Sequence, residues 1–334
     1  AMGDDGSLYI TECGVGGDEV LLPPNAQGTP APEVSPEEAP ANAVMRGYTG
    51  QITKVAPDGT QSVLVPGLAS YSTGIGPAGI ATSGSDLYFA MGGTGVAGGV
   101  DPLPEENTVN HVNPETGEVT MIAELGPYEE ENNPDGQNIN PNLHELEVDF
   151  DGRLIACDQG GNTIYAVDPS SGEIEVLVVI PTLGQLPGGQ EITGDAAQRQ
   201  SMPTSLVLGS ENKQIGLLSY AWPPSVPSVL SLSNDGNLTG VAGGLAFLVG
   251  LTYGRDGQLY GTQLFGPPDE SGQFGLGSIV RIYGDGTVET VLDGLLMPYG
   301  TAFDTDGNLY IAMRSLLSAP GTAAGQVIRI DGVA

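Results

Sequence analysis

The feature that most constrains the fold of this chain is a short unit that recurs six times. Each copy is a tight turn, usually Asp-Gly, followed by a strand containing Leu-Tyr or a close relative. Asp-Gly supplies the positive φ that short hairpins need, and alternating apolar residues form half-buried strands. The copies are irregularly spaced, about 45 to 80 residues apart. They are Asp5–Ile10, Ser85–Phe89, Asp151–Ile155, Asn212–Leu217, Asp256–Tyr260 and Asp306–Tyr310.

A second set of turns lies between these copies, flanked on both sides by alternating strands. These turns are Pro57–Gly59, Pro114–Gly117, Pro169–Gly172, Asn234–Gly236 and Gly284–Gly286. A further strand precedes each Leu-Tyr strand after the first, as at Leu143–Val148 and Pro203–Leu208. This order of strands and turns is the plan of a propeller blade. The sequence therefore predicts one all-β domain over residues 1–334, a six-bladed β-propeller with four-stranded antiparallel blades.

The two ends of the chain do not complete this pattern. Only Ala1–Gly3 precedes the first Leu-Tyr strand, and only Asp331–Ala334 follows the last predicted strand, Gln326–Ile330. We therefore expect the seam between the first and last blades to be open, or to be completed by missing or neighbouring chain, because unpaired strand edges invite pairing. A Pro/Glu-rich segment, 18–44, is predicted to be a surface insertion without periodicity.

The charge of the chain excludes two classes of partner. Nine Lys+Arg against 41 Asp+Glu give a net charge of −32, which opposes binding to nucleic acid or to anionic membranes. From Val55 to Gly152 there is no Lys or Arg, but 16 Asp+Glu. Salt, bound divalent cations or simple solvation would each screen this charge. The most charge-poor stretches are broken by Pro and Gly, so no membrane span is predicted. This composition suits a secreted, extracellular or cell-surface protein.

The densest polar cluster extends from Glu129 to Glu145 and offers hard oxygen ligands. Asn133, Asp135 and Asn138 are the candidate calcium ligands. The alternative is an Asn/Asp-rich turn whose side chains satisfy the loop backbone. His144 is either a general base or a hydrogen-bonded core residue, and His111 is expected to be structural. Cys13 and Cys157 are expected to be two free, mostly buried thiols, with a redox or metal role as the alternative.

Several segments resemble secreted six-bladed propellers of the ScyD/ScyE family, relatives of the NHL and SMP-30-like propellers. The matching segments are Gly6–Glu12, Gly47–Ile52, Asn132–Gly136, Cys157–Asn162 and Met202–Ser205. The resemblance spans nearly the whole chain and implies an extracytoplasmic propeller, associated in cyanobacteria with sunscreen-pigment biosynthesis. SMP-30-like lactonases place a divalent metal at the starts of the inner strands. Here those starts are mostly apolar, and only Asn142, His144 and Glu145 would serve. Cys13 and Cys157 depart from the small residues expected at their positions.

The sequence thus favours a secreted, non-enzymatic propeller that acts as a binding or self-assembly module of the cell surface or extracellular matrix. In its sharper form a terminal strand of one copy completes the open blade of the next, giving a homo-oligomer or filament. An extracellular small molecule or polysaccharide is the other expected partner. The alternative is a lactonase-like or lyase-like hydrolytic enzyme, with a divalent cation such as Ca²⁺ at the channel mouth near Asn142, His144, Glu145 and Asp158.

Overall fold

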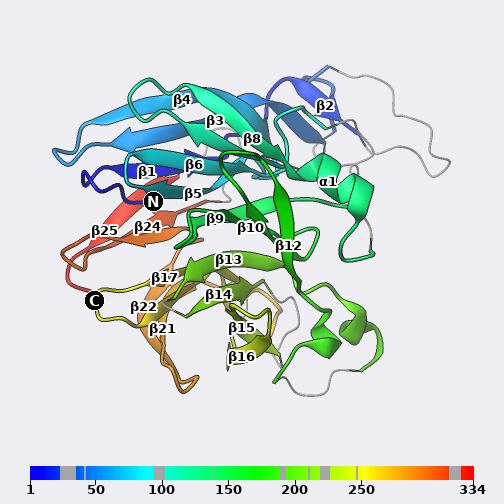
Figure 1. The fold of residues 1–334 in the computed structure, drawn as a ribbon, viewed down its shortest axis with the longest axis vertical. Coiled ribbons are helices and arrows are strands. Elements are labelled where there is room, and N and C mark those ends of the chain that lie inside the picture. Colours follow the sequence, from blue (N-terminus) through cyan, green and yellow to red (C-terminus); the bar gives the residue numbers. More distant parts are fainter. Residues whose placement is uncertain are drawn as a thin grey trace. The chain divides into compact units, whose positions relative to one another are not determined.

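The structure is a computed structural model that describes residues 1–22, 35–40, 43–93, 102–137, 139–188, 193–209, 211–218, 226–245, 247–315 and 325–334. Strands dominate these residues, with one α-helix, α1 (Leu125–Asn132), and two short 3₁₀ helices, Leu183–Gln185 and Gly194–Gln198. The strands form successive antiparallel sheets, each a meander (Figure 1). The predicted all-β, six-bladed β-propeller fold is confirmed.

The chain divides into two compact units. The first contains the described residues within Ala1–Ala156 and Ala166–Glu175. The second contains those within Cys157–Tyr165, Val176–Leu317 and Ala323–Ala334. We call the first strand of each meander its inner strand and the last its outer strand.

The first two sheets belong to the first unit. The first sheet contains β1 (Leu8–Glu12), β2 (Glu19–Leu21), β3 (Val44–Val55) and β4 (Gln61–Tyr71). The second contains β5 (Pro77–Ser83), β6 (Asp86–Met91), β7 (Thr108–Val112) and β8 (Val119–Glu124) in that order. The third sheet contains β9 (Leu143–Val148), β10 (Leu154–Asp158), β11 (Thr163–Val167) and β12 (Ile174–Val179).

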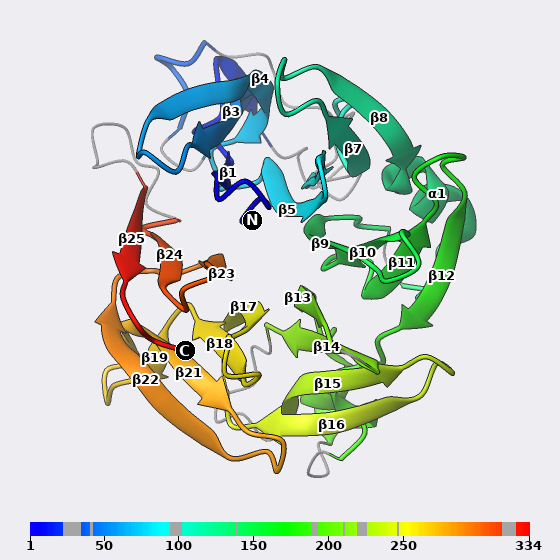
Figure 2. The ribbon, with the colours of Figure 1, turned by 60° about the vertical axis from the view of Figure 1, so that its left-hand side comes forward.

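The remaining sheets belong to the second unit, where β13, β17 and β23 are the inner strands (Figure 2). The fourth sheet contains β13 (Pro203–Leu208), β14 (Asn212–Leu217), β15 (Pro227–Ser233) and β16 (Leu238–Gly243). The fifth contains β17 (Leu248–Tyr253), β18 (Leu259–Gln263), β21 (Gly277–Ile282) and β22 (Val288–Leu295). Between β18 and β21 lies the hairpin of β19 (Gly266–Pro268) and β20 (Phe274–Gly275). The last sheet contains β23 (Thr301–Phe303), β24 (Leu309–Met313) and β25 (Gln326–Ile330).

The repeated Asp-Gly turns form hairpins for the reason that the sequence suggests. In the turn before β18, Gly257 has a φ of 73°, a region that favours glycine. The Asp256 side chain accepts a hydrogen bond of 3.0 Å from the Gln258 N–H, and Gly257 N–H donates to the Gly254 carbonyl. The turn thus satisfies its own backbone and fixes the register of β17 against β18.

The last sheet has three described strands, whereas each of the other five has four. Before β1, the first residues pair with Ser7–Tyr9: the Tyr9 N–H donates to the Ala1 carbonyl at 2.9 Å, the Gly3 N–H donates to the Ser7 carbonyl at 2.8 Å, and Met2 and Leu8 form an isolated bridge. In the last sheet β25 pairs with β24, and no described strand pairs with its other edge. The segment after β25 instead turns away: the Val333 N–H donates to the Gly307 carbonyl, and Arg281 donates to the Val333 carbonyl. Whether missing or neighbouring chain completes this edge stays a prediction.

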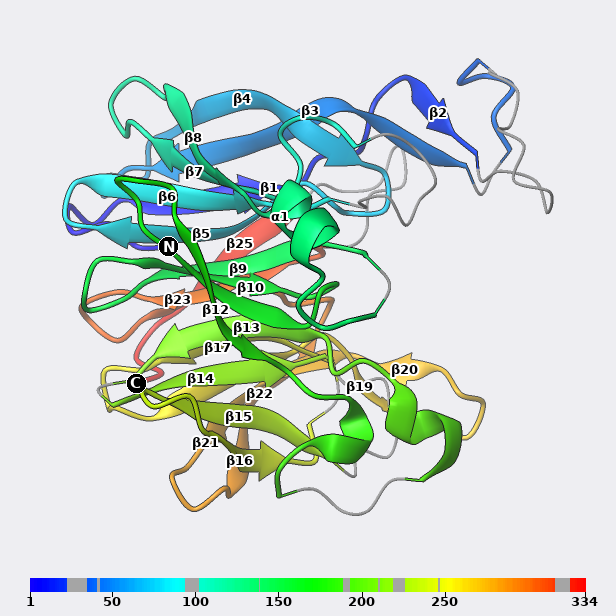
Figure 3. The ribbon, with the colours of Figure 1, turned by 45° about the vertical axis from the view of Figure 1, so that its right-hand side comes forward.

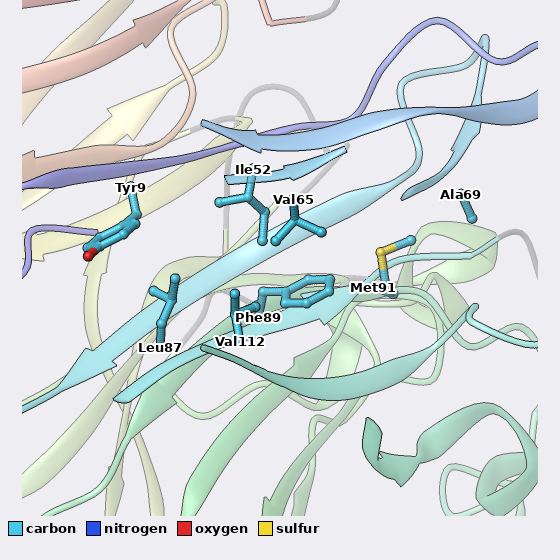
Figure 4. Close-up of a cluster of buried hydrophobic side chains, with 8 residues drawn as sticks. All are labelled: Tyr9, Ile52, Val65, Ala69, Leu87, Phe89, Met91 and Val112. Atoms are coloured by element: carbon cyan, nitrogen blue, oxygen red, sulfur yellow. The ribbon is translucent and has the colours of Figure 1, made fainter. Parts of the chain in front are cut away.

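The core of each unit lies between the faces of neighbouring sheets, where the apolar side chains of the alternating strands meet. Figure 4 shows the cluster between the first and second sheets. It contains Tyr9, Ile52, Val65, Ala69, Leu87, Phe89, Met91 and Val112, all buried. In the second unit one buried cluster joins the fourth and fifth sheets and another joins the fifth and last sheets.

Two buried asparagines link successive sheets. Asn107 and Asn162 precede β7 and β11 and adopt positive φ values of 53° and 48°. The Asn107 side chain accepts a hydrogen bond of 3.3 Å from the Leu143 N–H at the start of β9. The Asn162 side chain accepts one of 3.1 Å from the Met202 N–H just before β13. Asparagine tolerates this backbone region, so it can both turn the chain and bind the next inner strand.

The predicted insertion 18–44 is only partly described. Its beginning forms β2, which pairs with the N-terminal part of β3. β1 pairs with the C-terminal part of the same strand, so the long β3 carries both partners (Figure 3). No helix in the described part of the chain is long and apolar enough to cross a membrane.

Candidate functional site

The polar residues of β9 form the candidate site of the first unit. Glu145 and Glu147 are two positions apart, so they project from the same face of the strand, and both are half-buried. Burial raises the pKa of Glu145 from 4.5 to about 7. Burial and then repulsion from Glu145 raise the pKa of Glu147 to about 8. A carboxyl that titrates near neutral pH can exchange a proton or accept a cation.

The predicted residues Asn142 and His144 lie next to this pair. His144 is half-buried on β9, and Asn142 lies just before that strand. The Asn142 side chain accepts a hydrogen bond of 3.4 Å from the Gly93 N–H. β5 approaches β9 closely at Gly79, where an added Cβ would lie 2.5 Å from the Glu145 Cα. His144 and Glu145 are consecutive on β9 and therefore project from opposite faces of the strand. The role of Asn142, His144 and Glu145 as ligands stays a prediction.

The fourth predicted residue, Asp158, is fully buried at the end of β10, in the second unit. Its Oδ1 accepts hydrogen bonds of 3.0 and 2.9 Å from the N–H groups of Gly160 and Gly161. Asp158 therefore stabilises the turn between β10 and β11, which is the use that a buried aspartate at a tight turn ordinarily has.

The predicted calcium ligands lie at the end of α1. Asn133 terminates this helix with a φ of 40°, and its side chain donates to the Gln137 carbonyl at 2.9 Å. Asp135 accepts a hydrogen bond from the Gln137 N–H at 2.8 Å. Asn138 lies outside the described residues. Asn133 and Asp135 thus make the hydrogen bonds of an Asn/Asp-rich turn. In the described segments no group of three or more His, Cys, Asp or Glu side chains could hold a metal ion.

A buried polar chain in the first unit was not predicted. Arg46 is 8% exposed and donates to both carboxylate oxygens of Glu19, at 2.7 and 2.6 Å. Glu19, and then Tyr71, raise the pKa of the Arg46 guanidinium. The Tyr71 hydroxyl donates to Glu106 Oε1, which also accepts from the Leu103 N–H at 2.7 Å. This chain attaches β2 to β3 and fixes the segment before β7. Its one sequence signal is Arg46 itself, the first basic residue of the chain, within an otherwise apolar strand start.

The remaining candidates are structural. Cys13 is half-buried and Cys157 is buried, and neither forms a disulfide, as expected. Burial raises the pKa of the Cys13 thiol, which disfavours the reactive thiolate. His111 lies on β7 between Asp86, at 3.2 Å, and the Tyr88 ring, at 5.3 Å between centroids.

Comparison with known proteins shows the fold and no more. No family profile matches the chain, and no curated protein is similar to it. A protein of unknown function from Bacteroides thetaiotaomicron is similar in structure, with a TM-score of 0.54, 14% identity, and coverage of 93% of this chain and 74% of the other. A chain of a nidogen/laminin complex has a TM-score of 0.52 and 13% identity, covering 86% of this chain and 88% of the other.

A gluconolactonase from Xanthomonas campestris is also similar, with a TM-score of 0.50, 12% identity, and coverage of 92% and 86%. These neighbours belong to the NHL and gluconolactonase-like group of propellers. At this identity they share an architecture that hosts both binding domains and enzymes. The function must therefore be argued from the sites of this chain.

Proposed function

We propose that this protein is a secreted, non-enzymatic β-propeller that acts as a binding and self-assembly module of the cell surface or extracellular matrix. The observation that carries the proposal is the outer edge of β25, with which no described strand pairs. Each of the first five sheets ends in an outer strand, whereas β25 pairs with β24 alone among the described strands. Such an edge presents a row of backbone donors and acceptors to an extended segment.

The partner that fits this edge best is an extended segment of a second copy. β25 has the sequence Gln-Val-Ile-Arg-Ile, without an acidic residue. Its Arg329 is 52% exposed and forms an ion pair of 2.9 Å with Asp331, just past the strand. In a chain of net charge −32, most other surfaces of two copies repel each other. β25 adds no carboxylate of its own, so two such chains repel each other less at this strand than at most of their other surfaces. The nidogen/laminin neighbour is in keeping with this role, because that propeller fold occurs in a protein complex.

The test is the mass of the protein in solution, measured by light scattering over a range of concentrations. We expect species well above 34.1 kDa, with a fraction that increases with concentration. Arg329→Glu places a like charge on the edge and should return the protein to monomer. Arg255→Glu is the matched control, because it makes the same charge change at an exposed turn of the same unit. A monodisperse monomer at every concentration, or equal effects of both variants, would refute self-assembly.

A second candidate, a cation-dependent hydrolase, is favoured by the raised pKa values of Glu145 and Glu147. It is tested by assaying hydrolysis of simple aldonolactones with and without a divalent cation. If the protein is this enzyme, Glu145→Gln abolishes turnover and Arg329→Glu leaves it intact. If no lactone is hydrolysed with any divalent cation supplied, the hydrolase proposal fails and the binding module stands alone.

A further inference from the structure

Three bulky residues of the second unit have a backbone conformation that glycine ordinarily adopts. Met202, Phe247 and Met297 have φ values of 55°, 53° and 47°. Each lies shortly before an inner strand, β13, β17 or β23 respectively. Side chains with a Cβ pay an energetic cost in this region, and such strain is found where the surrounding structure serves a function. Its recurrence in three successive sheets needs an explanation.

The hydrogen bond that joins the residue before the inner strand to the end of the second strand does not require a positive φ. In all three sheets the carbonyl of the strained residue accepts a hydrogen bond from an N–H just past the second strand. These bonds are Leu218 to Met202 at 3.0 Å, Leu264 to Phe247 at 2.9 Å, and Ser315 to Met297 at 3.4 Å. The second sheet makes the corresponding bond from Gly92 to Gly76 at 2.9 Å, although Gly76 has no positive φ. What the positive φ changes in the second unit is therefore the placement of the side chain.

The three strained side chains come together in one apolar cluster. Its buried floor is Leu218, Val249 and Leu264, and the partly exposed residues Met202, Phe247, Phe265, Met297 and Tyr299 pack on that floor. The inner-strand starts of the first unit differ, since Gly76 and Asn142 stand at the corresponding positions there. The second unit thus builds a partly exposed apolar surface at this point of its sheets.

Phe274 lies on β20, in the hairpin β19–β20 (Figure 3), and its ring contacts two rings of this cluster. Phe274 is 44% exposed, stacks on Phe265 with an interplanar angle of 26° and centroids 5.7 Å apart, and meets Phe247 edge-on at 4.8 Å. Nearby in sequence, Leu276 is 52% exposed. Exposed aromatic groups of this kind are costly in water unless something covers them. We call Met202, Phe247, Phe265, Phe274, Met297 and Tyr299 the apolar platform.

We propose that the apolar platform binds a small, uncharged molecule with a planar ring. Aromatic faces stack on planar rings, and the thioether side chains of Met202 and Met297 adapt to irregular apolar shapes. A platform of about six side chains is far smaller than the 20 to 30 residues that each partner contributes to a stable protein interface, which argues against a second copy as the occupant. The charge of −32 disfavours an anionic ligand. This site is independent of the β25 edge.

The experiment is a fluorescence titration of the full chain with Nile red, a neutral planar dye whose emission increases in apolar surroundings. We expect one dye per chain, and about tenfold weaker binding by Phe274→Ala, which removes one stacking ring. Phe150→Ala is the matched control, because Phe150 is 78% exposed and belongs to the first unit. It should leave the dissociation constant unchanged, as should Arg329→Glu. The anionic dye 8-anilinonaphthalene-1-sulfonate should bind at least about tenfold more weakly than Nile red.

A second variant separates binding from folding. Met297→Gly relieves the strained φ while it removes a platform side chain, so it should weaken dye binding without lowering the melting temperature. The proposal is overturned if Phe274→Ala binds the dye as tightly as the unmodified chain. It is also overturned if Phe150→Ala loses as much affinity, since the dye would then report any exposed phenylalanine. Failure of Nile red to bind the unmodified chain would refute it directly and would leave the proposed assembly at β25 untouched.

Discussion

Replacing Glu147 by Gln should stabilise the protein at alkaline pH and leave it nearly unchanged at pH 5. The native pKa of Glu147 is about 8, compared with its ordinary 4.5, because burial and the neighbouring Glu145 disfavour the charged form. A carboxyl whose pKa is raised on folding binds more protons in the native state, so the free energy of unfolding falls as pH rises. This loss of unfolding free energy is absent below about pH 4.5, grows up to about pH 8 and is constant above that pH.

The size of the expected stabilisation follows from the difference between the native pKa of Glu147 and its ordinary pKa. At about 1.4 kcal/mol for each pKa unit, moving from 4.5 to about 8 would cost at most about 5 kcal/mol. Glu147 retains partial contact with solvent, which screens its charge, so we expect about 1–2 kcal/mol. For a chain of this length that corresponds to a rise of about 2–3 °C in the melting temperature at pH 9. Glu145→Gln should show the same trend with its midpoint nearer pH 7.

Melting temperatures measured from pH 5 to pH 9 test this expectation. Glu118→Gln is the control, because Glu118 is exposed in the same unit and should show no such trend. The reasoning is wrong if Glu147→Gln is destabilising at pH 9, or if its effect is the same at both ends of the range. Calcium that abolishes the pH trend in the unmodified chain would show that the carboxylates are held charged by a cation.

Three further predictions concern the sheets and the metal content. Gly79→Ala should lower the free energy of unfolding by about 3–5 kcal/mol, because the new Cβ would lie 2.3 Å from the Leu146 nitrogen. Gly284→Ala is the control, because its Cβ would enter open space and should change that free energy by less than about 0.5 kcal/mol. Chemical denaturation measures both values. Asn162→Ala should lower the free energy of unfolding by about 2 kcal/mol, because it removes the hydrogen bond from the Met202 N–H and places alanine at a positive φ. A melting temperature equal to that of the unmodified chain would contradict this. Elemental analysis after dialysis should find well under one divalent ion per chain, and one tightly held ion would instead favour the hydrolase.

The architecture could be predicted because its determinants are local. A hairpin needs a turn residue with positive φ and a two-residue alternation, and both are visible in a few consecutive letters, as at Asp256–Tyr260. The short helix α1 was not predicted, because it contains Gly126 and Pro127 and shows no apolar stripe of helical period.

The sites were harder to predict because they depend on contacts between distant residues. Glu106 receives its hydrogen bond from Tyr71, 35 positions earlier, and Tyr71 acts together with Arg46. No short sequence motif indicates such a series of hydrogen bonds. The raised pKa of Glu147 likewise comes from burial that only the packed sheets create. Asp158 shows that polar character alone does not reveal a role: its Oδ1 hydrogen-bonds the backbone of its own turn, and its role as a ligand stays a prediction.

The residue before the inner strand differs between the two units, and this difference is what separates the functional hypotheses. In the first unit that position is Gly76 or Asn142, beside carboxyls that titrate near neutral pH. In the second unit it is Met202 or Phe247, held in a strained conformation that a glycine would adopt without cost. An enzyme of the hydrolase kind depends on the first set, and a ligand-binding propeller depends on the second. Because the two sets share no residue, variants in one unit should leave the activity of the other unchanged, and each hypothesis can fail alone.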